Sequence, residues 1–144
     1  MLPKPPKLSK PPKLPMRQQL AHIAIVVDDY NRAIEFYTQK LRFNLLEDTV
    51  LSETKRWVLV APPGSTTSLL LAKAANEEQS SRIGNQTGGR GFLFLETDDI
   101  ARDIAFMRAS GVRFVREPVN ETWGTVAVFE DLYGNLWDLI ERNG

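Results

Sequence analysis

The sequence predicts an α+β fold made of two tandem βαβββ units, whose curved mixed sheets surround a cavity. The first observation is an internal repeat, because residues 21–71 align without a gap with residues 91–141 at a constant offset of 70. The second is that each half reads as one strand, one helix and three strands. A repeat of this length indicates two copies of one supersecondary unit, which together account for nearly the whole chain.

The aligned halves share nine identical positions, where chance predicts roughly three. They are Asp28/Asp98, Asp29/Asp99, Arg32/Arg102, Ile34/Ile104, Phe36/Phe106, Glu47/Glu117, Val58/Val128, Gly64/Gly134 and Leu69/Leu139. Residues that the two copies share are expected to maintain the fold. Function is therefore expected where the copies differ.

The first unit is predicted to span residues 20–73. Residues 20–27 form an apolar, β-branched run that is typical of a strand. Asp28 and Asp29 follow it, and acidic residues at this point cap a helix and suit the positive end of its dipole. An apolar stripe at helical spacing extends the helix to about Lys40. Strands are then expected at 43–48, 55–61 and 67–73.

The second unit is predicted to span residues 91–141. Its helix runs from Asp99 to Ser110, and Gly111 supplies the left-handed residue that ends it. Strands are expected at 91–97, 112–116, 124–130 and 135–141. Residues 74–90 join the units; they are polar and rich in glycine, which favours a mobile linker or a lid.

The first fifteen residues differ in composition from the rest. They hold six of the nine prolines and four lysines, without any acidic residue. Such a segment has little to bury, so residues 1–15 are expected to form a disordered, extended tail; a ligand for an SH3-type module is the alternative. Met16 begins the short segment that leads into the first strand, and it is a second candidate start. Residues 16–144 are predicted to form the single folded domain.

Composition argues against several classes of function. The 18 basic residues balance 18 acidic ones, and residues 16–144 keep 14 of the basic ones, which gives a net charge of 14 − 18 = −4. An acidic domain is not expected to bind nucleic acid or a membrane surface. The chain has no cysteine, which excludes thiol catalysis, thiolate metal ligands and disulfides. Without a secretory or membrane-spanning run, we expect a cytoplasmic protein.

Three segments, together with the repeated unit, resemble the vicinal oxygen chelate superfamily of glyoxalase I, extradiol dioxygenases, fosfomycin-modifying enzymes and bleomycin-binding resistance proteins. They are LAHIAIVVDD at residues 20–29, RWVLVAPPGS at 56–65, and WGT at 123–125 leading to DLYGN at 131–135. The resemblance covers residues 16–142. It implies the fold but leaves the function open, because this fold hosts several chemistries.

The resemblance implies where a metal ion would be held, since the metal enzymes of this superfamily use the first and last strands of both units. The repeat offset places those positions at His22 and Phe92 in the first strands, and at Ser68 and Asp138 in the last strands. Only His22 and Asp138 are plausible ligands. A catalytic ion usually needs three protein ligands, so one weakly held divalent ion (Zn, Ni, Mn or Fe) is the most that these positions predict.

Three polar side chains have more than one interpretation. Alternation along the strand places Glu96 on the face of Phe92, where it is a third ligand, a general base or a solvated strand end. His22, the sole histidine, is a metal ligand, a catalytic acid or base, or a pocket residue. Asp138 lies between Trp137 and Leu139 and needs a cation, such as Arg56, Arg90, a metal or a ligand amine, or else water.

Aromatic residues are expected to line the cavity. The predicted pocket comprises His22, Trp57, Ser68, Phe92, Phe94, Trp123 and Asp138. Rings with a few polar groups favour small organic ligands, and a ring at position 92 would fill a metal-ligand position.

Two classes of function follow. The first is a protein that binds a small organic molecule in an aromatic-lined cavity with a degenerate metal site. We expect it to be a homodimer, because curved sheets of this kind leave an apolar seam. The second is a metal-dependent lyase or dioxygenase of glyoxalase type that uses His22 and Asp138. Classical glyoxalase I activity is not expected, because two of its four ligand positions hold other residues.

Overall fold

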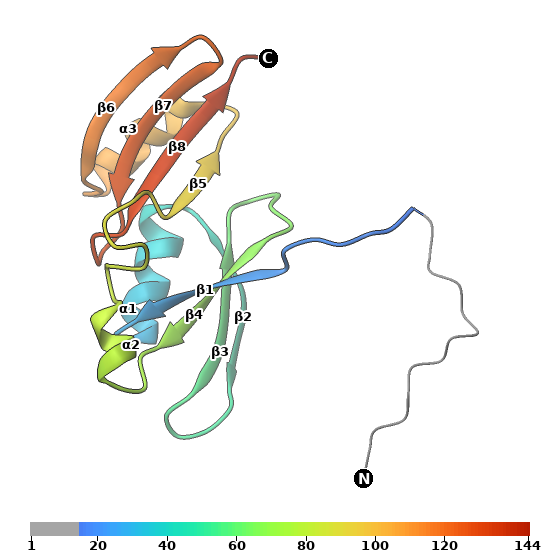
Figure 1. Ribbon diagram of the computed structural model, residues 1–144, viewed down its shortest axis with the longest axis vertical. Coiled ribbons are helices and arrows are strands. Elements are labelled where there is room, and N and C mark those ends of the chain that lie inside the picture. Colours follow the sequence, from blue (N-terminus) through green and yellow to red (C-terminus); the bar gives the residue numbers. More distant parts are fainter. Residues whose placement is uncertain (1–14) are drawn as a thin grey trace.

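The chain folds into two consecutive βαβββ units, as a computed structural model that describes residues 15–144 shows (Figure 1). The first unit comprises β1 (His22–Val27), α1 (Tyr30–Glu35), the π-helical turn η1 (Phe36–Lys40), β2 (Asn44–Val50), β3 (Arg56–Ala61) and β4 (Ser68–Lys73). The second comprises β5 (Leu93–Glu96), α3 (Ile100–Ala109), β6 (Phe114–Glu121), β7 (Gly124–Glu130) and β8 (Leu136–Arg142). The predicted α+β fold with a duplicated unit is confirmed, whereas most of the predicted tail lies outside the described residues.

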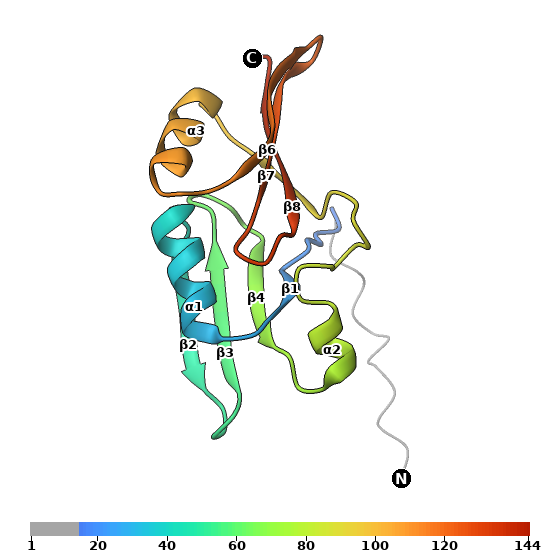
Figure 2. The same ribbon diagram turned by 90° about the vertical axis from the view of Figure 1, so that its left-hand side faces the viewer.

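Each unit forms its own four-stranded mixed sheet. The strand orders are β1-β4-β3-β2 and β5-β8-β7-β6, with β1 parallel to β4, β5 parallel to β8, and the other neighbours antiparallel. The two sheets follow one another along the long axis of the molecule, and the main helices α1 and α3 lie on the same side (Figures 1 and 2). Each sheet therefore has one face covered by a helix and one face open.

The repeated acidic residues form equivalent caps in the two units. Asp29 Oδ1 accepts the backbone N–H of Arg32 at 2.9 Å, which satisfies one of the free donors at the start of α1. Asp99 caps α3 through Arg102 in the same way, at 3.0 Å. The repeated aspartates thus cap the first turn of the equivalent helix in each unit.

One hydrophobic core continues from the first unit into the second. The ring centroid of Trp137 lies 6.0 Å from that of Tyr37 and 6.1 Å from that of Phe43. The Tyr37 hydroxyl donates a hydrogen bond to Asp131 Oδ2 at 2.7 Å, inside this core. Because these contacts join the first helical segment to the turn and last strand of the other sheet, the two units form one body.

The connection between the units is more structured than the sequence indicates. It contains a short helix, α2 (Glu77–Ser81), and then follows the edge of β1, where Gln86 Oε1 accepts the N–H of Val26 at 2.9 Å. Gly84 lies so close to the turn after β7 that a Cβ atom would stand 2.1 Å from the Tyr133 carbonyl oxygen. The expected mobile linker is therefore anchored at both units. Within residues 15–144, no helix is long and apolar enough to cross a membrane.

Candidate functional site

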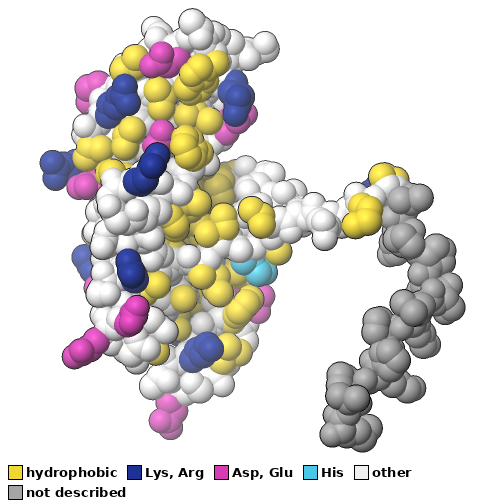
Figure 3. All heavy atoms as spheres, viewed as in Figure 1, with side chains coloured by type: hydrophobic (Ala, Val, Ile, Leu, Met, Phe, Trp, Pro, Cys, Tyr) yellow, Lys and Arg dark blue, Asp and Glu magenta, His cyan; other side chains and the backbone are white. Residues whose placement is uncertain are grey.

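The open faces of the two sheets carry most of the predicted site residues. Alternation along β1 turns Ile25 and Val27 into the core and leaves His22 and Ala24 exposed on the other face. Figure 3 views the molecule from this side and shows apolar side chains spread over both units, with the histidine on the first. An exposed apolar surface of this kind is a candidate binding face.

On the first sheet, the structure brings together three of the predicted residues. His22 is the register partner of Ser68 across β1 and β4. Its imidazole meets the Trp57 ring edge-on, with the ring centroids 5.9 Å apart. Trp57 also lines a hollow of about 640 Å³ with Leu70 and Ala72, and Gln79 of α2 is among its other lining residues. The first open face thus offers an indole surface beside the sole imidazole of the chain.

On the second sheet, Phe94, Trp123 and Asp138 come together. They line a hollow of about 320 Å³, with Val126, Ile140 and Arg142 as its remaining walls. The side chains of Phe94 and Trp123 are unusually open for large rings, at 69% and 43% exposed. This face presents two ring surfaces around one carboxylate.

Phe92 does not occupy the position that the repeat offset assigns to it. Strands β5 and β8 pair Phe94 with Asp138, a separation of 44 residues, whereas β1 and β4 pair His22 with Ser68, a separation of 46. The paired positions are thus two residues closer in sequence in the second unit. The constant offset of 70 therefore predicts Phe92 beside Asp138, whereas the neighbour in the structure is Phe94. The Phe92 ring instead packs edge-on against Trp137, with centroids 6.4 Å apart.

Near the second hollow, Glu96 has an ion-pair partner and Asp138 has none among residues 15–144. Glu96 Oε1 accepts a hydrogen bond from Arg142 Nε at 2.9 Å, so these two charges neutralise one another. Asp138 forms no ion pair or hydrogen bond among residues 15–144, and burial raises the pKa of its carboxyl, while the charge of Arg116 acts in the opposite direction. Arg56, one of the expected partners of Asp138, binds both oxygens of Asp48 instead.

The residues of one chain do not fit a catalytic metal ion. His22 and Asp138 lie on different sheets, and the described residues contain no group of three His, Cys, Asp or Glu side chains that could hold an ion. The cross-strand neighbour of Asp138 on β5 is Phe94, whose ring supplies no lone pair to a metal ion. Residues 15–144 of a single copy therefore do not gather the donors that a three-ligand site requires.

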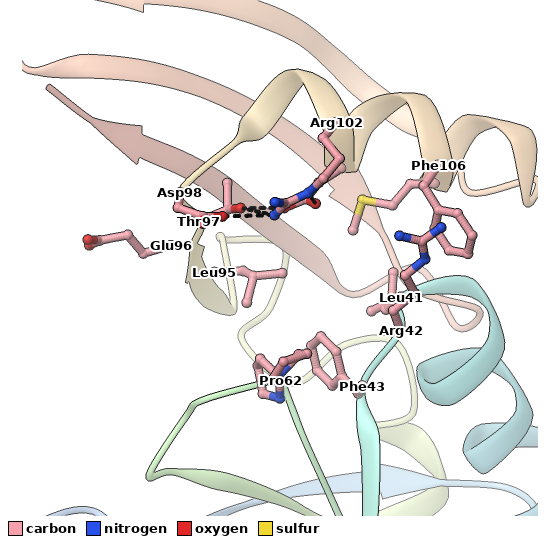
Figure 4. A pocket seen from close by; sticks show the side chains of 13 residues that line it. Leu41, Arg42, Phe43, Pro62, Leu95, Glu96, Thr97, Asp98, Arg102 and Phe106 are labelled. Atoms are coloured by element: carbon pink, nitrogen blue, oxygen red, sulfur yellow. Dashed lines mark hydrogen bonds and ion pairs between the residues drawn. The ribbon is translucent and has the colours of Figure 1, made fainter. Parts of the chain in front are cut away.

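A third cavity, of about 560 Å³, lies between the units and was not indicated by the sequence (Figure 4). Among its lining residues, Arg42 stacks on the ring of Phe106, with the guanidinium carbon 3.5 Å from the ring centroid. Arg102 also lines the cavity and forms ion pairs with Asp98 and Asp103, at N···O distances of 2.8 and 2.9 Å. Arg42 has a positive φ of 63°, the only such non-glycine residue in the described chain. An arginine in a loop gives no sequence signal for this conformation.

Known proteins resemble this chain over both units. The sequence profile described as Glyoxalase/Bleomycin resistance protein/Dioxygenase superfamily matches residues 19–139. An uncharacterized protein of Shewanella frigidimarina (strain NCIMB 400) is 59% identical over 130 residues, which cover 89% of this chain and 96% of that protein.

Two solved structures extend the likeness to three dimensions. The crystal structure of UcmS2 is 33% identical with a TM-score of 0.76, covering 87% of this chain and 98% of its own. That of TnmS3, described as an antibiotic binding protein from Streptomyces sp. CB03234, is 31% identical with a TM-score of 0.70, covering 88% and 98%.

Proposed function

Because the chain belongs to the glyoxalase/bleomycin resistance protein/dioxygenase superfamily, we propose that it binds a small organic molecule on the open faces of its sheets rather than converting one. The observation that carries this proposal is the pair of ring-lined hollows, around Trp57 on the first sheet and around Phe94 and Trp123 on the second. Rings with a few polar groups hold flat organic ligands by stacking and fix their orientation by hydrogen bonds. The description of TnmS3 as an antibiotic binding protein supports the same class of ligand.

A homodimer would complete the binding site. Each open face is one wall, and a twofold axis would lay the first sheet of one copy over the second sheet of the other. This arrangement would cover Phe94 and Trp123, which are costly to leave in water. It would also enclose a ligand between hollows of about 640 and 320 Å³, which are in the size range of drug-sized ligand sites.

The degenerate metal site is part of the proposal. His22 keeps one potential ligand, but Ser68 beside it and Phe94 beside Asp138 are poor donors to a metal ion. A neutral imidazole both donates and accepts hydrogen bonds, so His22 is suited to orient a carbonyl or hydroxyl of the ligand next to the Trp57 ring.

The three tryptophans provide the direct test. Trp57 and Trp123 line the hollows, whereas Trp137 is 3% exposed in the core. Flat aromatic antibiotics should quench the emission of the first two, and Trp57→Phe and Trp123→Phe should each remove part of the quenching. Quenching that persists in the double variant would contradict the proposed site, and so would the absence of quenching with every compound.

The dimer has a separate test. Phe94→Glu places a charge on the seam and should convert the protein to monomers in analytical ultracentrifugation, with an unchanged circular dichroism spectrum. Ala105→Glu, at an exposed position on α3 and thus on the helix-covered side of the second sheet, makes the same change in charge and should leave the dimer intact. A wild-type protein that is monomeric at every concentration would refute the shared site.

A divalent-metal-dependent lyase or dioxygenase is the second candidate function. It is favoured by one observation, that His22 and Asp138 both lie on the open faces, so a dimer could bring them together. Chelator-treated protein would be heated with Zn, Ni, Mn or Fe. An ion that binds only the folded protein, at a concentration a hundred times its dissociation constant, adds about 2.7 kcal/mol to the free energy of unfolding. A rise in Tm that Asp138→Ala abolishes would therefore favour the metal-dependent enzyme. No shift with any ion is expected for the binding protein.

A further inference from the structure

The carboxylate of Asp138 is the charge on the second open face that the fold leaves without a partner. It takes part in none of the ion pairs or hydrogen bonds of residues 15–144, although seven ion pairs form elsewhere in that part of the chain. Its Oδ1 atom lies over the bare backbone of Gly91, where an added Cβ would stand 3.2 Å away. A partly buried carboxylate that lacks a partner is costly unless something bound supplies one.

The neighbouring cations do not fill this role. Arg142 lines the same hollow, but it binds Glu96. Arg116 on β6 is the cross-strand neighbour of Val128 on β7, and Val128 is the cross-strand neighbour of Asp138 on β8. The backbone of Arg116 is therefore two strands away from that of Asp138, or about 10 Å at the usual strand spacing. Its charge acts on Asp138 only through space. A direct partner therefore has to come from outside the sheet.

The surroundings of the carboxylate suit an organic cation better than a metal ion. Phe94 is its register partner on β5, and Trp123 lines the same hollow. Ring faces attract an ammonium group through their quadrupole, whereas they offer no lone pair to Zn or Ni. The folded domain also carries a net charge of 14 − 18 = −4, which favours approach of cations.

We propose that the ligand of this protein is a flat aromatic compound that carries a protonated amine, with the amine held between the Asp138 carboxylate and the rings of Phe94 and Trp123. This inference rests on the proposed function, because it assigns the ligand class of the same open faces. The aromatic part of the ligand stacks on the exposed rings, and its amine supplies the charge that Asp138 lacks. The superfamily's metal position is thereby used for an organic cation.

Two fluorescent probes of similar shape and opposite charge test the proposal on the full chain. One is 9-aminoacridine, a three-ring cation at neutral pH, and the other is 9-anthracenecarboxylate, a three-ring anion. The cation should bind at least about tenfold more tightly. Asp138→Asn should reduce the affinity for the cation by about tenfold or more and leave binding of the anion unchanged or stronger.

Glu130→Gln is the matched control, because Glu130 lies on β7 of the same sheet and is already paired with Arg113. It should leave the affinity for both probes unchanged. Equal binding of the two probes, or an equal loss in both carboxylate variants, would overturn the inference while the proposed binding function stands. If neither probe binds at millimolar concentration, both the inference and the proposed function are refuted.

Discussion

Replacement of Tyr37 by phenylalanine should cost about 2 kcal/mol of stability, because it removes one buried bond between the units. The Tyr37 hydroxyl is fully buried and lies 2.7 Å from Asp131 Oδ2, and Asp131 is 4% exposed. The same carboxylate accepts hydrogen bonds from the side chain of Asn135 and from the backbone N–H groups of Tyr133 and Asn135. Tyr37→Phe keeps the ring and its contact with Trp137, so the loss is confined to the bond.

The magnitude follows from the charge of the acceptor. A hydrogen bond to a charged group contributes about 1.5–3 kcal/mol, and Asp131 would retain three donors, so a value of about 2 kcal/mol is expected. The structure describes 144 − 14 = 130 residues. At about 2.1 cal/mol/K per residue, their unfolding entropy is about 0.27 kcal/mol/K, so Tm should fall by about 7 °C.

Tyr133→Phe is a matched control for this prediction. The Tyr133 hydroxyl also donates to an aspartate of the other unit, Asp28 Oδ1 at 2.7 Å, but at the surface. Water replaces a lost surface bond, so the cost should stay well below about 1 kcal/mol. Urea unfolding of both variants measures the difference. Equal losses, or a Tyr37→Phe variant as stable as the wild type, would refute the view that the buried carboxylate joins the two units.

Two further predictions concern the connection between the units and the pH dependence of stability. Gly84→Ala should destabilise the protein more than Gly88→Ala in urea unfolding: both positions have positive φ, which costs an alanine about 1–2 kcal/mol, but only a Cβ at 84 would meet the Tyr133 carbonyl. Burial raises the pKa of the Asp138 carboxyl, so the folded protein keeps this proton to higher pH than the unfolded chain, and stability falls as pH rises from about 4 through the folded pKa. Asp138→Asn should therefore be more stable than the wild type at pH 7 but not at pH 3, as measured by Tm; a difference independent of pH would contradict the assignment.

The duplicated architecture could be predicted because its causes are local. The cap residues Asp29 and Asp99 act within three positions of themselves, and the alternation of β1 turns His22 to the open face without help from distant residues. These features repeat in the sequence because each copy of the unit needs them. The same reasoning placed Trp57, Phe94 and Trp123 on strands or next to them.

The rest depended on contacts that no local pattern encodes. Strands β5 and β8 pair at a separation of 44 residues, whereas β1 and β4 pair at a separation of 46, so the offset of 70 identified Phe92 where the structure has Phe94. The anchoring of residues 74–90 depends on Gly84 meeting a turn of the second unit. The cavity beside Arg42 is lined by residues of both units, from the connection that leads into β2, the turn after β3, strand β5 and helix α3.

The register of β5 allows a last experiment on how a binding face differs from a metal site in this superfamily. Phe94 is the cross-strand neighbour of Asp138, at the usual strand spacing of about 4.8 Å, whereas Phe92 packs on Trp137. Phe94→His should therefore add an imidazole beside the carboxylate and produce a Ni- or Zn-induced rise in Tm that the wild-type protein is not expected to show, while Phe92→His should mainly disturb the core. An imidazole and a carboxylate are two of the usual three ligands of catalytic zinc. Stronger metal binding by Phe92→His than by Phe94→His would show that the strand pairing is displaced, whereas the expected result would show that one aromatic side chain keeps this face free of metal.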